Sequence, residues 1–289
     1  MSARGNATIQ RIVDIDPFAL QLGFLLPGAS LDALSEHRAA LDGAHVDWGG
    51  GTILLAVQSH LVRAGGKTIL IDTCVGEHKQ RPARADWHDR ASTRYLAKLK
   101  ACGCTPDDVD IVMCTHLHAD HVGWNTRLDN GQWVPTFAKA QYLMSLREVE
   151  QRANEAAVKP EANHGSYQDS VLPVLERGAA AFVDAGDEIV DGGKILALPG
   201  HAPGQIGLEL QQASGTDIFC GDAIHSPVQV FRPEWSSAFC HDKAQAAVTR
   251  RALLERAAGE ELRLIPAHLR GSHMGVRETG GRFTPVIAP

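Results

Sequence analysis

Three histidines and one aspartate lie within six consecutive residues, in the segment THLHADH that covers residues 115–121. This segment directly follows VDIVMC (109–114), an apolar run that predicts a buried strand. Imidazole nitrogens and carboxylate oxygens are the ligands that zinc and similar divalent metals prefer. A single histidine is more often a surface or satisfied core residue, but burying three adjacent rings without partners costs several kcal/mol. Because such a loop can aim its ligands at two points, it predicts a site for two metals.

Three later segments each place one further candidate ligand directly after an apolar, strand-like run. The ligands are His201 after KILALPG, Asp222 after DIFCG and His268 after RLIPA. Each of them, taken alone, could be an ordinary polar residue of a loop. The repeated pattern of strand, small residue and ligand favours the interpretation that they complete the metal site.

The chain resembles the metallo-β-lactamase-fold hydrolases in five segments. These are LIDT (70–73), THLHADH (115–121), LPGHAPG (198–204), GD (221–222) and PAH (266–268). The resemblance extends from about residue 50 to the end of the chain. It implies an α/β fold, the four-layer αββα sandwich, with the site at one edge. The family usually has glycine after the threonine of LIDT, where this chain has Cys74.

The resemblance also implies seven ligands for two divalent metal ions, with zinc as the expected metal. It assigns one ion to His116, His118 and His201, the other to Asp120, His121 and His268, and a bridging role to Asp222. Asp72 would accept a hydrogen bond that orients one of the ligand rings. Related di-iron electron-transfer proteins usually have glutamate at the place of His118, so this histidine favours a zinc hydrolase.

Strand-like and helix-like stretches alternate along the chain and would position these ligands. Strands are predicted at 52–58, 68–71, 111–114 and 218–220, and helices at 91–101, 145–157 and 243–259. Strands mixed with surface helices are typical of a layered α/β domain. No linker, repeat or low-complexity tract interrupts the alternation, so a single domain over residues 1–289 is predicted.

Charge and composition argue against several classes of partner. The formal net charge is −6, and no basic run is interleaved with aromatic residues, which argues against nucleic acid. No apolar stretch reaches the roughly 20 residues of a membrane span, and the N-terminal MSARGN lacks the apolar core of a secretory signal. We therefore expect a cytoplasmic protein without a membrane partner; the sequence leaves open whether it forms a homodimer.

The six cysteines are too few and too scattered for a disulfide framework. Cys114 and Cys220 fall in apolar strand-like runs and are expected to be buried. Cys102 and Cys104 are interpreted as reduced thiols in a turn between a helix and a strand. Metal binding or redox cycling by this pair is the alternative.

The predicted chemistry is hydrolysis by a hydroxide held between two metal ions. Two metals about 3.5–4 Å apart can lower the pKa of a shared water to about 7 and polarise the substrate oxygen. Asp120, with its other carboxylate oxygen, could take up a proton and pass it to the leaving group. The reaction class is then hydrolysis of an ester, lactone, amide or phosphoester, without a serine or cysteine nucleophile.

Side chains near the predicted ligands favour a small, neutral, hydrophobic ester or lactone as substrate. His225, three residues after Asp222, could donate a hydrogen bond to the substrate or shuttle a proton. Each pocket candidate could equally be a core or surface residue; the candidates are Trp124, Phe231 and Trp235, with Phe24, Leu25, Leu26 and Phe239 as further ones. Since no cluster of lysines and arginines accompanies them, a polyanionic substrate is disfavoured.

The segments 239–251 and 266–286 resemble lactonases, arylesterases and methyl-parathion-type organophosphate hydrolases. This resemblance favours a lactonase or esterase, with organophosphate triester hydrolysis as a side activity. One alternative is a glyoxalase II-like thioesterase, which would need a basic glutathione site, and another is a persulfide dioxygenase with a single iron. A β-lactamase is a third. A non-catalytic binding module is disfavoured because all seven ligand positions are filled.

Overall fold

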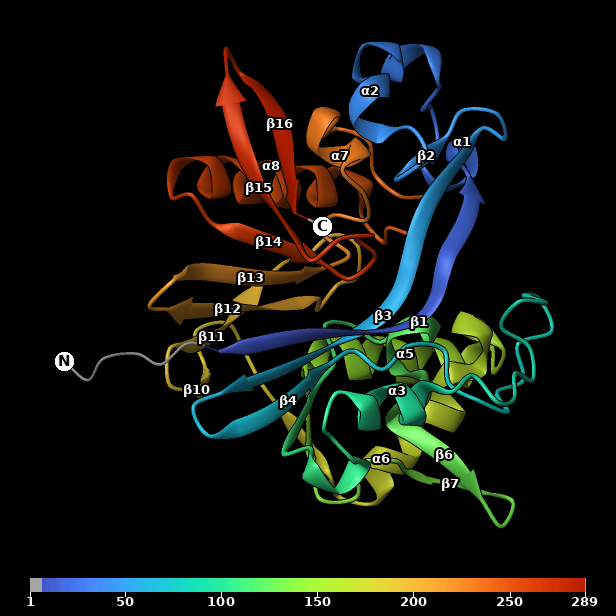
Figure 1. Cartoon of the computed structure of the whole chain (residues 1–289). Coiled ribbons are helices and arrows are strands. Elements are labelled where there is room, and N and C mark those ends of the chain that lie inside the picture. Colours follow the sequence, from blue (N-terminus) through green and yellow to red (C-terminus); the bar gives the residue numbers. More distant parts are fainter. Residues whose placement is uncertain (1–6, 289) are drawn as a thin grey trace. The chain divides into compact units, whose positions relative to one another are not determined.

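The computed structural model describes residues 7–288 of the chain (Figure 1). The segment 1–6, which carried the argument about a secretory signal, lies outside the described residues, as does Pro289. The chain divides into two compact units. Unit 1 consists of Met1–Asp14 and Val57–Ile195, and unit 2 of Ile15–Ala56 and Leu196–Pro289. The single domain expected over residues 1–289 stays a prediction.

Unit 1 contains a mixed sheet with helices beside it (Figure 1). Its elements are β1 (Thr8–Gln21), β3 (Thr52–Ala64), β4 (Lys67–Ile71), α3 (Tyr95–Ala101), β5 (Ile111–Met113), α4 (Ala119–Val122), β6 (Thr126–Asp129), β7 (Gln132–Pro135), β8 (Gln141–Met144), α5 (Leu146–Val158), α6 (Leu172–Glu176), β9 (Ala180–Phe182), β10 (Glu188–Val190) and β11 (Gly193–Ala197). Three of these strands, β1, β3 and β11, also include residues of unit 2. The strands of the sheet lie in the order β1-β3-β4-β5-β8-β9. β6 pairs with β7, and β10 pairs with β11.

The central strands of unit 1 bring two loops of interest to one edge of the sheet. β4 and β5 are parallel, with Ile71 opposite Met113. The buried residues of both strands are apolar, as is typical of strands covered on both faces. Because parallel strands end at the same edge, Asp72 after β4 and the segment 115–121 after β5 emerge as neighbours.

Unit 2 contains most of the second sheet, whose strands lie in the order β10-β11-β12-β13-β14-β15-β16. Its elements are α1 (Leu22–Leu25), α2 (Arg38–Leu41), β2 (Val46–Asp47), β12 (Ile206–Gln212), β13 (Gly215–Gly221), α7 (Val228–Phe231), α8 (Lys243–Gly259), β14 (Arg263–Pro266), β15 (His273–Thr279) and β16 (Arg282–Ala288). β13 and β14 are the parallel pair of this unit, with Gly221 opposite Pro266. Asp222 and His268 follow these strands closely and therefore emerge at one edge of the sheet.

Helix α8 covers the sheet of unit 2 and completes its core. Leu253, Leu254 and Ala257 of this helix pack with Met274 from β15 and Phe283 from β16. Full burial of one such large apolar side chain contributes about 1.5–3 kcal/mol. The packing therefore fixes the sheet edge from which two of the candidate ligands emerge.

The helices agree in type with the sequence-based expectation but differ in where they begin. The segment 243–259 is α8, and 145–157 is shifted by one residue to become α5. The helix expected at 91–101 begins only at Tyr95, because Ser92 and Arg94 have φ values of 58° and 64°, in the left-handed region. Among residues 7–288, no helix combines the length and the apolarity that crossing a membrane requires. Two mixed sheets flanked by helices confirm the predicted α/β class.

Candidate metal centre

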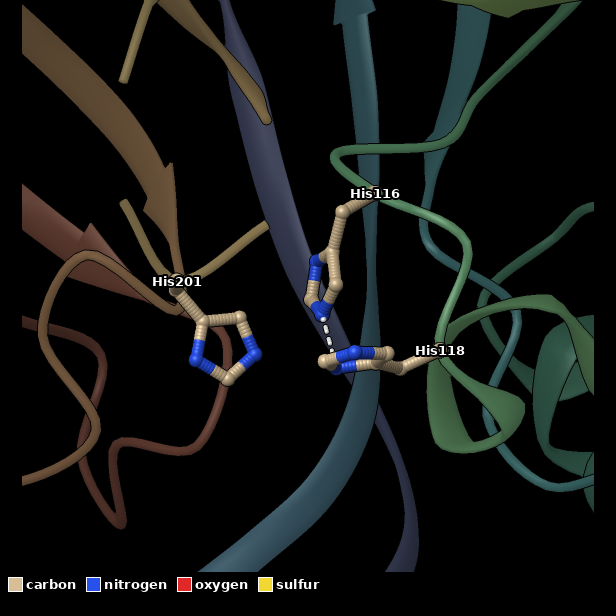
Figure 2. A group of neighbouring side chains, drawn as sticks. All are labelled: His116, His118 and His201. Atoms are coloured by element: carbon tan, nitrogen blue, oxygen red, sulfur yellow. Dashed lines mark hydrogen bonds between the residues drawn. The ribbon is translucent and has the colours of Figure 1, made fainter. Parts of the chain in front are cut away.

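The first two histidines of the 115–121 segment lie in direct contact after β5. His116 Nε2 and His118 Nδ1 are 3.0 Å apart, and the two rings are nearly perpendicular, at 80°. Figure 2 marks this contact with a dashed line. His116 Nδ1 lies 3.1 Å from the hydroxyl of Thr115, which leaves Nε2 as the nitrogen that faces His118. Figure 2 also labels His201, which belongs to unit 2 and follows β11.

Asp72 connects the loop after β4 to the loop after β5. Its Oδ1 accepts a hydrogen bond from the backbone N–H of Thr115 (2.8 Å), and its Oδ2 accepts one from the Thr115 hydroxyl (2.8 Å). The same Oδ2 accepts from Nδ1 of His121 at 2.9 Å. This contact fixes the ring of His121 through Nδ1, so that Nε2 is the nitrogen that could bind a metal. The predicted role of Asp72 requires this arrangement.

The backbone around His121 is held just as tightly. Thr73 donates its N–H (2.6 Å) and its hydroxyl (3.2 Å) to the carbonyl of His121. Gly123 packs so closely on the backbone of Val75 that a Cβ at this position would overlap the Val75 carbonyl. Cys74, where the family usually has glycine, has a φ of 53°, in the left-handed region that glycine adopts most easily.

Two residues that the sequence did not reveal as part of this site support its outer side. Asn163 donates to the carbonyl of Leu117 (2.6 Å) and accepts from the N–H of Ala119 (3.1 Å), so it holds the backbone on both sides of His118. Arg152 of α5 lies 3.4 Å, through Nη2, from His118 Nε2. Nothing in the sequence around these two residues marks them, because both lie more than 30 positions from the residues of the 115–121 segment that they contact.

In unit 2, Asp222 is the common neighbour of two predicted ligands. Its Oδ2 lies 3.3 Å from Nε2 of His201, and its Oδ1 lies 3.3 Å from Nε2 of His268. All three residues are buried. Since the two oxygens face different rings, the carboxylate has the orientation that a bridging ligand needs.

The two histidines of unit 2 that are predicted as ligands, His201 and His268, each have a contact at Nδ1 that orients the ring. His268 Nδ1 donates to the carbonyl of Ala56 at 2.8 Å, and the N–H of Ala56 donates to the carbonyl of His268 at 3.0 Å. The thiol of Cys240 lies 3.6 Å from Nδ1 of His201. Outer contacts of this kind fix the tautomer and direct Nε2 toward a ligand or metal.

His225 is buried beside Asp222, with 2% of its surface exposed. Its Nε2 lies 3.3 Å from Asp222 Oδ2, and its ring lies 4.9 Å from the ring of His201. Its backbone N–H donates to the side chain of Gln229 at 2.7 Å. The structure therefore excludes a surface position for His225, while its predicted contact with substrate stays a prediction.

The predicted pocket aromatics fall into different environments. Trp124 belongs to unit 1, is buried and stacks on Tyr95, with 5.2 Å between ring centroids. In unit 2, Phe231 stacks on His37 at 3.9 Å, and Arg232 lies over the ring of Trp235 at 5.7 Å. The role of these three aromatics in a pocket stays a prediction.

All six cysteines lie within the described residues and are free thiols. Burial raises the pKa of Cys114 to about 12 and that of Cys240 to about 11. Burial also raises the pKa of Cys104. A protonated thiol is a poor nucleophile, so these three cysteines are unsuited to attack a substrate at neutral pH.

The donor atoms in each unit fit a divalent metal ion. Two ligand atoms at about 2.0–2.1 Å from one tetrahedral zinc lie roughly 3.3–3.4 Å apart. The separations of 3.3 Å around Asp222 in unit 2 match this spacing, and the 3.0 Å between His116 and His118 in unit 1 comes close. Asp120 Oδ1 lies 3.8 Å from Nε2 of His121. The assignment of the seven residues as ligands stays a prediction that this spacing supports.

Comparisons with known proteins identify relatives of the chain. The family model described as "Metallo-beta-lactamase superfamily" matches residues 52–268. An N-acyl homoserine lactonase of Bacillus thuringiensis is 28% identical over 134 residues, which are 46% of this chain and 46% of that protein. The chain thus aligns with about half the length of this curated relative.

Two solved structures are similar over nearly the whole chain. One is AidC, described as a dizinc quorum-quenching lactonase in complex with a product, with a TM-score of 0.77 and 19% identity over 99% of this chain and 96% of that one. The other is the hydrolase AbOPH of the beta lactamase superfamily, with a TM-score of 0.78 and 22% identity over 100% of this chain and 98% of that one. At these identities the likeness concerns the fold.

The matched range contains all the segments that carried the predicted resemblance, from Leu70 to His268. Similarity to lactonases appears both in the sequence comparison and in the comparison of structures. The predicted family is confirmed. The chain belongs to the metallo-beta-lactamase superfamily and has its fold, with two mixed sheets flanked by helices.

Proposed function

We propose that this protein is a metal-dependent hydrolase of the lactonase type. The seven predicted ligands would hold two divalent metal ions, with zinc as the expected metal. These residues are His116, His118, Asp120 and His121 of unit 1 and His201, Asp222 and His268 of unit 2. The dizinc description of AidC and the family membership support two metals.

The observation that carries the proposal is the orientation of ligand rings by outer partners in both units. In unit 1, Asp72 accepts from Nδ1 of His121, and in unit 2 the carbonyl of Ala56 accepts from Nδ1 of His268. Each contact leaves Nε2 as the ligating nitrogen. In both histidines Nε2 faces a carboxylate oxygen of another predicted ligand, Asp120 for His121 and Asp222 for His268.

The bound metals would supply two effects, the polarisation of a carbonyl oxygen and a lowered pKa of water. The protein contributes the position of the reacting groups. We propose that Asp120, whose side chain is largely buried beside His121, takes the proton that the attacking water loses when its oxygen adds to the lactone carbonyl. Asp120 would then give this proton to the ring oxygen as the ring carbon–oxygen bond breaks. Asp72 and Thr115 keep the loop that carries Asp120 in place.

The substrate class that fits best is a neutral lactone or ester with an apolar tail. In unit 2, Phe24 and Phe239 are 54% and 44% exposed and meet edge to face, with 5.7 Å between ring centroids. Phe239 directly precedes Cys240, whose thiol lies against the ring of His201. An exposed aromatic pair beside a predicted metal ligand suits an aliphatic acyl chain. Acyl-homoserine lactones, the substrates named for the Bacillus thuringiensis relative, are of this class.

A metal-quantified substrate panel tests the proposal. The purified protein is analysed for zinc, manganese, cobalt and iron, and is then given a hexanoyl-homoserine lactone, an aryl ester and a phosphotriester. We expect about two divalent ions per chain, opening of the lactone, and loss of activity on chelation with recovery when zinc is restored. The phosphotriester tests the predicted side activity in the same assay.

Two variants separate the site from the rest of the protein. His116→Ala should abolish lactone opening, whereas His78→Ala, at an exposed position of the same unit, should leave it unchanged. One metal or none per chain, together with no hydrolysis of any of the three substrates, would overturn the proposal. A single iron with oxygen consumption would favour the persulfide dioxygenase, and cleavage of a glutathione thioester alone would favour the glyoxalase II-like enzyme.

A further inference from the structure

His225 is a buried histidine whose two ring nitrogens need an explanation. Within the described residues 7–288, neither ring nitrogen of His225 has a hydrogen-bond partner. A buried polar group without a partner destabilises the folded state. Such a position is maintained when the nitrogen serves a function, and the surroundings of the ring indicate which one.

The surroundings of His225 have the geometry of a metal site. Its Nε2 and the Nε2 of His201 both lie 3.3 Å from the same oxygen, Oδ2 of Asp222. Donor atoms around one tetrahedral zinc lie roughly 3.3–3.4 Å apart, so both separations match. The three donor atoms of these residues lie within 4.8 Å of one another, and all three side chains are buried.

We propose that His225 is a metal ligand, and that His201, Asp222 and His225 hold one divalent ion within unit 2. This inference rests on the proposed metal-dependent function and adds an eighth ligand to the seven predicted ones. His268 faces the other oxygen of Asp222, so the carboxylate is left to bridge toward a second ion. His225 would thus complete a site whose three ligands all come from one unit.

The loop that carries His225 is rigidly held. The side chain of Gln229 accepts from the N–H of His225 and donates to the carbonyl of Trp235 at 2.8 Å. Arg250 of α8 is buried and donates to the carbonyls of Ala223 (2.8 Å) and Trp235 (3.0 Å). A ring on this loop therefore keeps its position without help from a substrate.

His225 differs from the other two unit 2 histidines in one respect. His201 and His268 each have an outer contact at Nδ1, with Cys240 and with the carbonyl of Ala56. Because Nδ1 of His225 has no such contact among the described residues, His225 should be the most weakly held of the three as a ligand. An incoming substrate could then displace His225 from the metal. His225 would in that case be a metal ligand in the free enzyme and a neighbour of the substrate during the reaction.

Cobalt titration of the full-length protein tests the inference. The parent is a variant with His116→Ala, His118→Ala and His121→Ala, which removes the histidine donors of unit 1. We expect this variant to keep one cobalt per chain, with the visible absorption of a four- or five-coordinate ion. Adding His225→Ala should weaken cobalt binding roughly tenfold or more, and His273→Ala, elsewhere in the same unit, should leave it unchanged.

A cysteine variant gives a signature that packing alone cannot produce. His225→Cys in the same background should restore binding and add a strong sulfur-to-cobalt charge-transfer band in the near ultraviolet. Circular dichroism checks that each variant is folded. Equal cobalt affinity with and without His225, or no charge-transfer band from a folded cysteine variant, would overturn the inference. If His225→Ala in the otherwise unchanged protein reduced kcat/KM but left the metal content at about two, His225 would contact substrate only, and the proposed function would stand.

Discussion

The two units hold their predicted ligands in different ways. In unit 1 all four lie in one short segment that runs from the loop after β5 into α4. This segment is fixed by contacts from Asp72, Thr73 and Asn163. In unit 2 the ligands come from three separate loops, and Asp222 is the residue to which the others turn. The positions of the unit 1 ligands therefore depend on several contacts, whereas those of the unit 2 ligands depend mainly on one carboxylate.

Each unit contains a buried cationic side chain that donates hydrogen bonds to neighbouring segments, Lys79 in unit 1 and Arg250 in unit 2. In unit 1, Lys79 donates to the hydroxyl of Thr126 (2.6 Å) and the carbonyl of Asp169 (2.9 Å), and lies 3.6 Å from the ring of Trp133. In unit 2, Arg250 donates to three backbone carbonyls in the segment that follows Asp222. Lysine loses its charge more readily than arginine when buried, so the two units should respond differently to pH.

The largest effect is expected at Asp222. Asp222→Ala removes the carboxylate that two predicted ligands and His225 face, and leaves three buried rings without their common neighbour. We expect the metal content to fall from about two ions to one or fewer, and lactone opening to become undetectable. Metal analysis and the lactone assay measure both. Asp42→Asn, at a more exposed carboxylate of the same unit, is the control, and full metal content in Asp222→Ala would contradict the comparison.

A smaller loss is expected at Asp72, because unit 1 has other supports. Asp72→Asn keeps an oxygen for the N–H of Thr115 but replaces the oxygen that accepts from His121 with an amide donor. Loss of such an outer contact typically weakens metal binding about 10- to 100-fold. Competition with a chromophoric chelator measures this affinity, with Asp89→Asn, exposed in the same unit, as control. An unchanged affinity would show that Thr73 and Asn163 suffice to hold the loop.

Arg250→Met tests the stability of the unit 2 loop rather than metal affinity directly. The change leaves the carbonyls of Ala223, Pro233 and Trp235 without their donor, and we expect the free energy of unfolding to fall by about 3 kcal/mol. Arg251→Met, at the neighbouring exposed position of α8, should change it by less than about 0.5 kcal/mol. Urea unfolding followed by circular dichroism measures both. Equal effects of the two substitutions would show that the Arg250 contacts are dispensable.

The sequence predicts those features that depend on residues close together in the chain. The histidines of 115–121 lie close together in the chain, and three further ligands each follow an apolar run, namely His201, Asp222 and His268. Both groups of predicted ligands can therefore be recognised from short sequence segments. Parallel pairing of β4 with β5 and of β13 with β14 explains why this pattern works, since it brings the strand ends together. The family and the α/β class follow from the same segments.

What the sequence could not predict depends on contacts between distant residues. Arg250 reaches the loop after Asp222 from the middle of a helix whose arginines all look alike in the sequence. Trp124 and Phe24 were equal as pocket candidates, yet the first is buried against Tyr95 and the second is exposed. Aromatic residues serve cores and pockets equally well, so only packing separates them.

The smallest predicted effect, a pH dependence, concerns Lys79. Burial lowers the pKa of Lys79 to about 7, whereas an unfolded chain holds this proton with a pKa near 10.5. The unfolded chain therefore binds more protons between these values, and stability should rise as the pH is raised from about 7 toward 10. Burial lowers the pKa of Arg250 to about 10, so it stays protonated over most of this window and adds little slope there.

Lys79→Met should remove the part of the rise that Lys79 contributes, which amounts to at most about 1.4 kcal/mol per pH unit. Urea unfolding at several pH values between about 7 and 9.5 measures the slope in the unchanged protein, in Lys79→Met and in Arg250→Met. We expect Arg250→Met to keep the slope and Lys79→Met to lose part of it. Parallel curves for the two variants would mean that Lys79 keeps its proton through its contact with Asp169, and the two buried cations would then differ only in their partners.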